Sequence, residues 1–424
     1  MNKLWAEHGL DPCDISISTF NPHSRAFQRD PYSAYARLRE TPGLTWYEPY
    51  RTWLVSRFAE VNHCVKNPQL VRTLDSFTRL EDRLAQKRRD NWHDMPFHSR
   101  FVQFSMLDSD GEVHDRLRAQ VFRFFGPAPI AGLRSLLEPG ISRRVSEAVE
   151  RREFEFVEDL AAKVPGYAIG TLMGVPEADC EQIRVWSELI VQYFDVDRSD
   201  HRKNLAEGAT EAFYDYLQDL VAHRQKLDPN NRPDDLLSKL VAVEAAGLIS
   251  HDELYSTCML IVMAGHGSTL DVMGSGLLAL LRFPEQQAKL RADPTLMKTA
   301  IAEMFRFESP LPFFHRYAAK DIEFCGQSFS QGTRFGLLYG AANRDPAVFD
   351  EPQRFDVSRW PNRHLAFGGG AHFCLGNHLA RLSMDILFTQ LLAMTADIEL
   401  ADEPEFKPGL SARGPVTLPV RITL

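Results

Sequence analysis

The sequence predicts a mostly helical α+β protein with small β-sheets. Over most of its 424 residues, apolar side chains recur at spacings of three and four, the period of a helix with one buried face. Strand-like stretches are short, and they lie near the N-terminus, ahead of a glycine-rich loop at residue 367, and at the C-terminus. Because nothing between these stretches has the composition of a linker, we expect one domain over residues 1–424.

The expected helices share the helical periodicity. They cover residues 31–41, 59–66, 112–125, 130–151, 156–173, 178–194, 204–225, 233–246, 251–282, 284–292, 295–307 and 378–395. Strands are expected in a hairpin over residues 45–56 that turns near Glu48 and Pro49, in residues 322–340 and in the tail 416–424.

The longest expected helix, residues 251–282, has a recognisable start. Ser250 is a candidate N-cap, and Glu253 three residues later completes a capping box. Near the middle of this helix stands AGHGST, residues 264–269, in which Gly265 and Gly267 each cost roughly 1 kcal/mol relative to Ala. A phosphate-binding loop would need a following Gly-Lys-Ser/Thr, which is absent, so a kink over a cofactor is the other interpretation.

The composition is that of an ordinary globular protein, with 44% hydrophobic and 25% charged residues and a net charge of −9. A nucleic-acid partner is not expected, because such proteins usually show a basic face. The six cysteines form no CxxC pair, so neither a disulfide framework nor a zinc site is indicated, and a reducing compartment fits. They are Cys13, Cys64, Cys180, Cys258, Cys325 and Cys374.

Neither a signal peptide nor a membrane span is expected. Residues 1–18 lack a basic start followed by an apolar core. The longest apolar run, residues 258–265, is too short to cross a bilayer. We therefore expect a cytoplasmic protein without a membrane partner.

The stretch FGGGAHFCLG, residues 367–376, places Cys374 in a loop just before an expected helix. Backbone N–H groups at a helix N-terminus favour a thiolate, and the glycines allow the backbone to approach something flat and large. A buried structural cysteine is the plainer interpretation of a lone cysteine. The glycine context favours the thiolate.

This stretch resembles the FxxGxxxCxG signature of the cytochrome P450 family, the haem-thiolate monooxygenases. It matches at Phe367, Gly370, Cys374 and Gly376. The resemblance implies a triangular helical domain with haem b between the long central helix and the cysteine loop. It implies that Cys374 is the thiolate ligand of the haem iron, that Phe367 packs beside it, and that the amides after it tune the donation of the sulfur.

A second match is EMFR, Glu303 to Arg306, which fits the ExxR helix of the family. A glutamate and an arginine three apart share one helix face, and alone they are usually a solvated surface pair. The resemblance implies instead that Arg359, in the segment before the cysteine loop, joins them in a buried structural triad.

Haem carries two propionates, which cations must meet. HDRLR gives His114 and Arg118 four residues apart, and this resembles the propionate clamp of the family. Arg316 and His372 fit the other propionate contacts. Each of the four alone would more often be a surface charge, but together they stand at the expected places relative to two independent signatures.

AGHGST aligns with the oxygen-activation motif [AG]Gx[DE]T of the family. Ala264 and Gly265 fit and are expected to clear space against the haem, whereas Gly267 replaces the proton-relaying acid. Ser268 replaces the usual threonine unless Thr269 takes that role. Gly267, Ser268 and Thr269 are the expected catalytic positions. One alternative is that protons are delivered by another route, for which His266 and Asp271 lie nearby in the sequence. The other is that the reaction depends less on delivered protons.

The resemblance also implies a substrate pocket between the central helix, the segment before the sheet and a turn of the tail. Its expected lining is Leu260, Met263, Ala264, Gly267, Ser268, Leu311, Phe313, Phe314, Ser411 and Ala412. The loop at about residues 74–104 would cover it, and its arginines or histidines would anchor an acidic substrate; a solvated loop is the plainer interpretation.

The family implies oxidation, by hydroxylation or demethylation, of a small apolar or aromatic molecule with O₂ and two electrons. The electrons would come from a ferredoxin or flavodoxin with its reductase, docked near Arg116 and Arg381, and a monomer is expected. An alternative is oxidative phenol coupling or peroxide-driven oxidation, because an acid is missing at Gly267. A haem-binding sensor without turnover is a third hypothesis.

Overall fold

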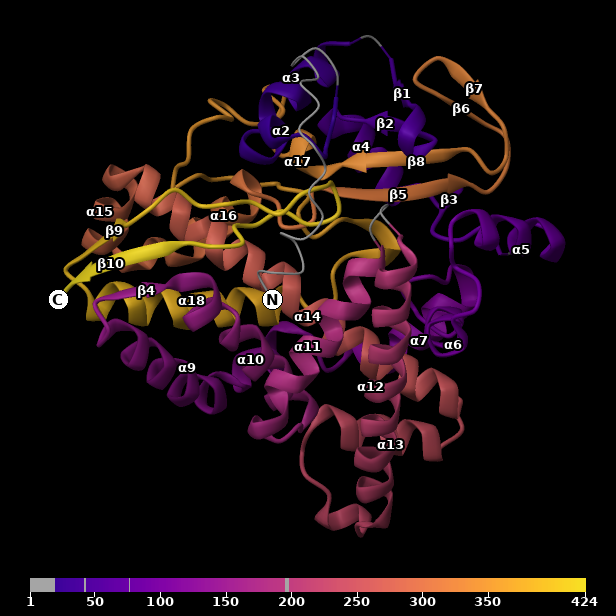
Figure 1. Cartoon of the computed structure of the whole chain (residues 1–424), viewed down its shortest axis with the longest axis horizontal. Coiled ribbons are helices and arrows are strands. Elements are labelled where there is room, and N and C mark those ends of the chain that lie inside the picture. Colours follow the sequence, from indigo (N-terminus) through magenta and orange to yellow (C-terminus); the bar gives the residue numbers. More distant parts are fainter. Residues whose placement is uncertain (1–19, 42, 76, 195–197) are drawn as a thin grey trace.

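The computed structural model describes residues 20–424 except residues 42, 76 and 195–197. In Figure 1 two of the sheets lie in the upper part of the molecule and the third lies at its left, and the helices taper toward the outer ends of α12 (Asp200–Lys226) and α13 (Leu236–Ala245). Cys13 and the N-terminal residues 1–18 discussed above lie outside the described residues.

Each predicted helix has a counterpart in the structure. The remaining helices are α2 (Arg25–Arg29), α3 (Tyr32–Glu40), α4 (Phe58–Lys66), α5 (Leu80–Arg89), α6 (Pro96–Gln103), α7 (Gly111–Phe122), α8 (Pro127–Gly132), α9 (Arg134–Val149), α10 (Lys163–Met173), α11 (Cys180–Val191), α14 (His251–Arg282), α15 (Pro284–Ala292), α16 (Met297–Phe307), α17 (Tyr339–Ala342) and α18 (Asn377–Met394). Of these, α2, α5, α6 and α17 lie outside the predicted helix ranges.

Helix α14 is the buried axis of the helical part and has the predicted bounds. The capping box is present: the Glu253 N–H donates to Ser250 Oγ over 3.3 Å, and the Ser250 N–H donates to Glu253 Oε2 over 2.8 Å. The helix runs through AGHGST without interruption, so its two glycines do not break it. Gly265 serves close packing instead, because a Cβ there would lie 3.0 Å from Ile169 of α10.

Three small sheets surround this helical core. The largest has the order β1-β2-β8-β5-β3, formed by β1 (Thr45–Tyr47), β2 (Thr52–Val55), β8 (Arg334–Leu338), β5 (Phe313–Ala318) and β3 (Leu70–Val71). A second joins β4 (Glu153–Glu155), β10 (Pro419–Thr423) and β9 (Asp397–Leu400), and the third pairs β6 (Ile322–Phe324) with β7 (Gln327–Phe329). In β5 the period of two places Phe314 and Arg316 on one face.

The sequence missed strands β3, β4, β5 and β9 as well as several short helices. Strand β5 was not predicted, because its run of aromatic and basic residues lacks a clean alternation of apolar and polar. The predicted covering loop at residues 74–104 is wrong in part, since it contains α5 and α6. Helix α5 buries no residue, and it therefore has no apolar stripe by which periodicity could reveal it.

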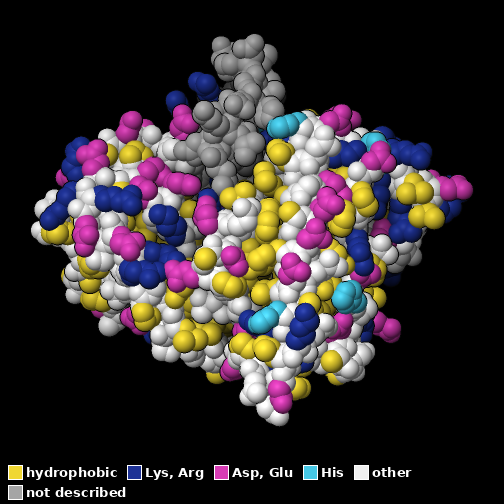
Figure 2. Space-filling model, turned by 60° about the horizontal axis from the view of Figure 1, so that its bottom comes forward, with side chains coloured by type: hydrophobic (Ala, Val, Ile, Leu, Met, Phe, Trp, Pro, Cys, Tyr) yellow, Lys and Arg dark blue, Asp and Glu magenta, His cyan; other side chains and the backbone are white. Residues whose placement is uncertain are grey.

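Over the face shown in Figure 2, side chains of both charge signs are interspersed with scattered hydrophobic ones. No described helix is both long and apolar enough to span a membrane.

Candidate functional site

The cysteine loop closes on itself directly ahead of α18. The Cys374 N–H donates to the Phe367 carbonyl over 2.9 Å, which joins the first and eighth residues of the predicted signature. Phe367 packs against Phe305 of α16, with ring centroids 4.4 Å apart, and against Phe373 at 6.4 Å. The sulfur is thereby held at the first turn of a helix, where free N–H groups point toward it.

Two opposing effects act on the Cys374 thiol. Burial raises its pKa, whereas the amides of Gly376 and Asn377 donate to the sulfur and lower the pKa. The guanidinium groups of Arg118 and Arg381 lower it further. The predicted arrangement of amides behind the sulfur is therefore present.

A buried ion network lies beneath this loop. The Arg306 guanidinium donates to both oxygens of Glu303 over 2.7 Å each, and both side chains are 0% exposed. Arg359 Nε donates to Glu303 Oε1 over 3.1 Å, so the structure brings the three predicted structural residues together. Asn362 and the Asp356 amide also donate to the carboxylate, at 3.0 Å each.

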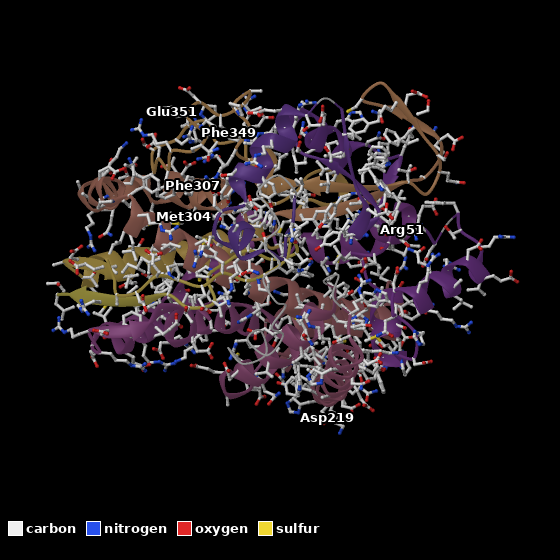
Figure 3. The ribbon with its side chains drawn as sticks, turned by 45° about the horizontal axis from the view of Figure 1, so that its top comes forward. Arg51, Asp219, Met304, Phe307, Phe349 and Glu351 are labelled. Atoms are coloured by element: carbon white, nitrogen blue, oxygen red, sulfur yellow. The ribbon has the colours of Figure 1, made fainter. Side chains whose placement is uncertain are left out.

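Arg306 links this pair to the chain that leads into the loop. It donates to the carbonyls of Asn343, Pro352 and Arg354 over 2.9–3.1 Å. Phe307 and Phe349, labelled in Figure 3, lie on the same side of the molecule, and the guanidinium stands 5.7 Å and 5.3 Å from their ring centroids. A bidentate charge pair that also satisfies backbone carbonyls fixes the path of a segment that has little regular structure.

The predicted clamp residues meet at the N-terminal end of α7. His114 is 1% exposed and its ring lies 4.3 Å from that of His372. His372 Nε2 in turn lies 3.2 Å from Asp110 Oδ1. One turn beyond His114, Arg118 donates to the Phe373 carbonyl over 2.5 Å, so α7 and the cysteine loop are joined by both residues of the HxxxR pattern.

Arg316 approaches the same region from β5. It is 3% exposed, burial lowers its pKa to about 10, and its one protein hydrogen bond in the described structure goes to the His315 carbonyl at 2.9 Å. Arg72 lies close by and also donates to the His315 carbonyl, over 3.0 Å, and to Asp108 over 3.3 Å.

Sequence reasoning missed Arg72 and Asp110. Asp110 directly precedes α7, which is the usual position of an N-cap, but its side chain accepts from the backbone N–H groups of Arg72 and Thr73 at 2.8 Å and 3.2 Å. Its position before a helix was a signal for capping only. Arg72 belongs to no motif, so no sequence signal was available for it.

On the opposite side, α14 presents a small open surface in an otherwise buried helix. Ala264 is exposed, and Gly267 and Ser268 are half-buried, whereas Thr269 is buried. A Cβ added at Gly267 would meet nothing within 4 Å. The Ser268 hydroxyl donates to the Ala264 carbonyl at 3.4 Å, which places this hydroxyl, rather than that of Thr269, on the exposed face.

The predicted pocket residues divide between two faces. Leu260 and Met263 line α14 beside Ala264, and Phe314 shares the Arg316 face of β5, with the Arg72 guanidinium 4.2 Å from its ring centroid. Leu311, Ser411 and Ala412 are half-buried. Phe313 is 6% exposed and packs with Tyr50 at 6.0 Å on the other face of β5, away from Phe314 and Arg316.

These groups fit a large dianionic cofactor that carries a metal. Arg316 has no acidic partner within the described structure, and His114 Nε2 is buried there without a hydrogen-bond partner. Buried cations and donors of this kind require acceptors, and the two propionates of haem would supply them. The cysteine sulfur, with its amide donors, would supply the axial ligand.

Comparison with known proteins decides between the interpretations. A profile described as Cytochrome P450 matches residues 185–394. PksS, a polyketide biosynthesis cytochrome P450 of Bacillus subtilis (strain 168), is 33% identical over 415 residues, which cover 95% of this chain and 98% of the relative. The chain belongs to the cytochrome P450 family.

Two solved cytochrome P450 structures are similar over nearly the whole chain. P450BioI, in complex with an acyl carrier protein ligated to hexadec-9Z-enoic acid, has a TM-score of 0.85 at 30% identity, and covers 94% of this chain and 100% of its own. The myxobacterial CYP267B1 in complex with myristic acid has a TM-score of 0.86 at 31% identity, and covers 95% of this chain and 98% of its own.

Membership of the family confirms the predicted fold class, cofactor and general activity. Cytochromes P450 bind haem b through a cysteine thiolate and are monooxygenases that use redox partners and small-molecule substrates. The enzyme is therefore an oxidoreductase, and the hypothesis of a sensor without turnover loses its support.

Proposed function

We propose that Cys374 is the axial ligand of haem b in this cytochrome P450. The observation that carries the proposal is the sulfur at the start of α18 with the Gly376 and Asn377 amides directed at it. Arg316, His114, Arg118 and His372 would hold the propionates, and the buried Glu303–Arg306–Arg359 network would keep the loop in place. When bound, haem supplies the activation of O₂, with electron density pushed from the thiolate.

Residues of α14 would line the side of the cofactor opposite Cys374, where the reaction takes place. The small, exposed Ala264 would leave room for the cofactor, and the Ser268 hydroxyl stands on the exposed face of α14 as a hydrogen-bond donor. Thr269 and Gly267 were the other two expected catalytic positions; Thr269 is buried, and Gly267 offers space but no proton.

We propose that the substrate is a small apolar or aromatic molecule that is hydroxylated or demethylated, and that an apolar chain with an acidic end is the first class to test. The apolar α14 face of Leu260 and Met263 and the ring of Phe314 support an apolar body. The exposed cations of α5, Lys87, Arg88 and Arg89, support an acidic end. Two similar proteins were solved with fatty-acyl ligands.

A spectral titration of the haem protein tests this choice. We expect myristate to shift the haem spectrum toward the high-spin form at lower concentration than its methyl ester, an aromatic acid or a terpenoid. Single replacements of Arg88 and Arg89 by Ala should raise the dissociation constant of myristate and leave that of the methyl ester unchanged. Equal dissociation constants for acid and ester would exclude recognition of the acidic end.

A second candidate reaction rests on Gly267. Because the usual acid is missing at an open position, peroxide-driven oxidation or phenol coupling would place less demand on proton delivery. Turnover with hydrogen peroxide alone, or a product two mass units lighter than the substrate, would favour this candidate. A product sixteen units heavier that needs NADPH and a redox partner would favour the monooxygenase.

We propose a ferredoxin or flavodoxin with its reductase as the electron source. Of the two cations expected to dock it, Arg116 pairs with Glu253 at the start of α14, and Arg381 lies 4.9 Å from the ring centroid of Phe367. Both positions are next to the elements that carry the cysteine loop. Replacing Arg116 by Ala should slow reduction of the haem by the partner protein but not by dithionite.

A further inference from the structure

The open position at Gly267 leaves this enzyme without the residue that would pass protons toward the distal face. Oxygen insertion consumes them: R–H + O₂ + 2e⁻ + 2H⁺ gives R–OH + H₂O. Two buried titratable residues of α14 flank the position, His266 and Asp271. Their directions decide which of them can serve.

His266 points away from the open surface. Its Nε2 lies 3.0 Å from the Ala162 carbonyl, ahead of α10, and its Nδ1 lies 3.8 Å from Glu188 of α11. Burial lowers its pKa to about 4, so that the ring is neutral near pH 7. One residue of helix turns a side chain by about 100°, which places this ring on the α10 and α11 side.

Asp271 has the opposite placement. It follows Gly267 by four residues and Ser268 by three, so it shares their face of α14. A helical side chain leans toward the preceding turn, so Asp271 lies on the side of the open space at Gly267, and none of its atoms comes within 4 Å of a Cβ placed there. Nothing lies within 4 Å of a Cβ at Gly267 to block that space.

A second observation shows that this carboxyl group is held and not merely buried. Asp271 is 2% exposed, and its Oδ1 accepts a hydrogen bond of 2.6 Å from Lys407 Nζ. Lys407 belongs to the tail turn, in which its N–H donates to the Gly414 carbonyl over 3.1 Å. Gly414 lies directly on Asp271, because a Cβ at 414 would come within 2.5 Å of Oδ1. The Lys407 side chain is 19% exposed and so reaches solvent.

We infer that Asp271 is the proton relay of this enzyme, displaced by one helical turn from the usual position, and that Lys407 is its positioning residue. The inference rests on the proposed function, since it assumes O₂-dependent turnover at the haem. The Asp271 carboxylic acid gives its proton to the groove beside Gly267 and Ser268 and becomes a carboxylate, which the Lys407 ammonium stabilises. A proton from solvent, entering along Lys407, restores the acid, and two such cycles supply the two protons.

The test replaces Asp271→Asn in the haem-loaded enzyme, which keeps the shape and an acceptor for Lys407. We expect product formation to fall about 100-fold, the usual contribution of a general acid, with the electrons of NADPH diverted to hydrogen peroxide. Lys407→Met should cause a smaller loss in the same direction. Asp219→Asn, at the far end of the helical part (Figure 3), and the exposed Lys298→Met are the matched controls and should equal the parent.

A structural role for the Asp271–Lys407 pair makes a different prediction. If the pair only ties α14 to the tail, adding Gly267→Glu to Asp271→Asn will restore nothing. If Asp271 is the relay, the added carboxyl group will recover most of the product, because it places an acid at the open position. A double variant no better than Asp271→Asn overturns the inference.

A crystal structure of the haem-loaded enzyme gives a readout independent of turnover. Water joining the Asp271 carboxyl group to the Ser268 hydroxyl is expected, and protein atoms sealing that space would contradict the relay. The two proposals fail separately. If the parent lacks the thiolate spectrum with carbon monoxide, the proposed function fails; if the parent turns over normally and Asp271→Asn equals it, only this inference fails.

Discussion

The two sides of the cofactor site differ in how closely their residues are held. On the cysteine side, buried ion pairs and backbone hydrogen bonds hold the segments around Cys374 and Glu303. On the α14 side, the expected acid is absent, the surface at Gly267 is open, and a buried ion pair stands one turn away. Holding haem by a thiolate therefore leaves little freedom in the residues around the cysteine, whereas on our proposal the protons can be supplied from another position of α14.

The largest effect is expected on the cysteine side. Cys374→Ala should abolish the thiolate-type carbon monoxide spectrum and reduce monooxygenase activity to background, because the axial sulfur is lost. Cys325→Ala, which removes an exposed cysteine, is the control and should keep both. If Cys374→Ala kept the thiolate spectrum, another cysteine would be the iron ligand. The contrast between the cysteine side and the α14 side would then not hold.

The next effect tests the rigidity of the cysteine side. Glu303→Gln leaves Arg306 and Arg359 without their carboxylate in a site that is 0% exposed, and should lower the free energy of unfolding by about 3–5 kcal/mol. Glu351→Gln, in a pair with Arg354 whose side chains are 64% and 56% exposed, should change it little. Chemical denaturation of the haem-loaded proteins measures both changes. Equal losses of unfolding free energy would show that the buried network stabilises the fold no more than an exposed ion pair does.

A smaller effect is expected where the cofactor's edge meets the sheet. Arg316→Gln removes a buried cation, and the loss of one charged hydrogen bond, worth about 1.5–3 kcal/mol, should weaken haem retention about 10- to 100-fold. The rate of haem transfer to an excess of apomyoglobin measures it. Arg421→Gln, exposed on β10, should transfer haem at the rate of the parent. Unchanged transfer in Arg316→Gln would exclude this arginine as a propionate partner.

The smallest effect is expected on the α14 side. Gly267→Asp restores the usual acid at a position with room for it, and should modestly raise the ratio of product to NADPH consumed, since Asp271 already relays protons. Gly267→Ala supplies bulk without an acid and should leave that ratio unchanged. A large gain in Gly267→Asp would show that the parent lacks an efficient relay and would favour a reaction with less need of protons.

Sequence reasoning was strongest where one motif fixes both spacing and chemistry. The bounds of α14 and α15 and the approach of Glu303, Arg306 and Arg359 could be predicted because capping residues and fixed spacings act locally. The side of β5 that Phe313 faces could not, since an unrecognised strand has no defined register. Arg72 meets Asp108 and the His315 carbonyl only through the tertiary fold.

The sequence also could not predict in which direction a side chain points from a correctly predicted helix. Both His266 and Asp271 were visible beside the missing acid, but which of them faces the open surface depends on where α10 and the tail turn pack. The packing of Gly265 could not be predicted for the same reason. Its lack of a side chain admits Ile169 of α10, which only the tertiary fold brings there.

We propose that the haem iron of this enzyme is bound by Cys374. The carbon monoxide difference spectrum of the reduced protein, purified with its haem, tests it most directly. We expect the strongly red-shifted band of a thiolate-bound haem, lost in Cys374→Ala and kept in Cys325→Ala. A band at the position of a nitrogen-ligated haem in the parent, or no haem band at all, would contradict it.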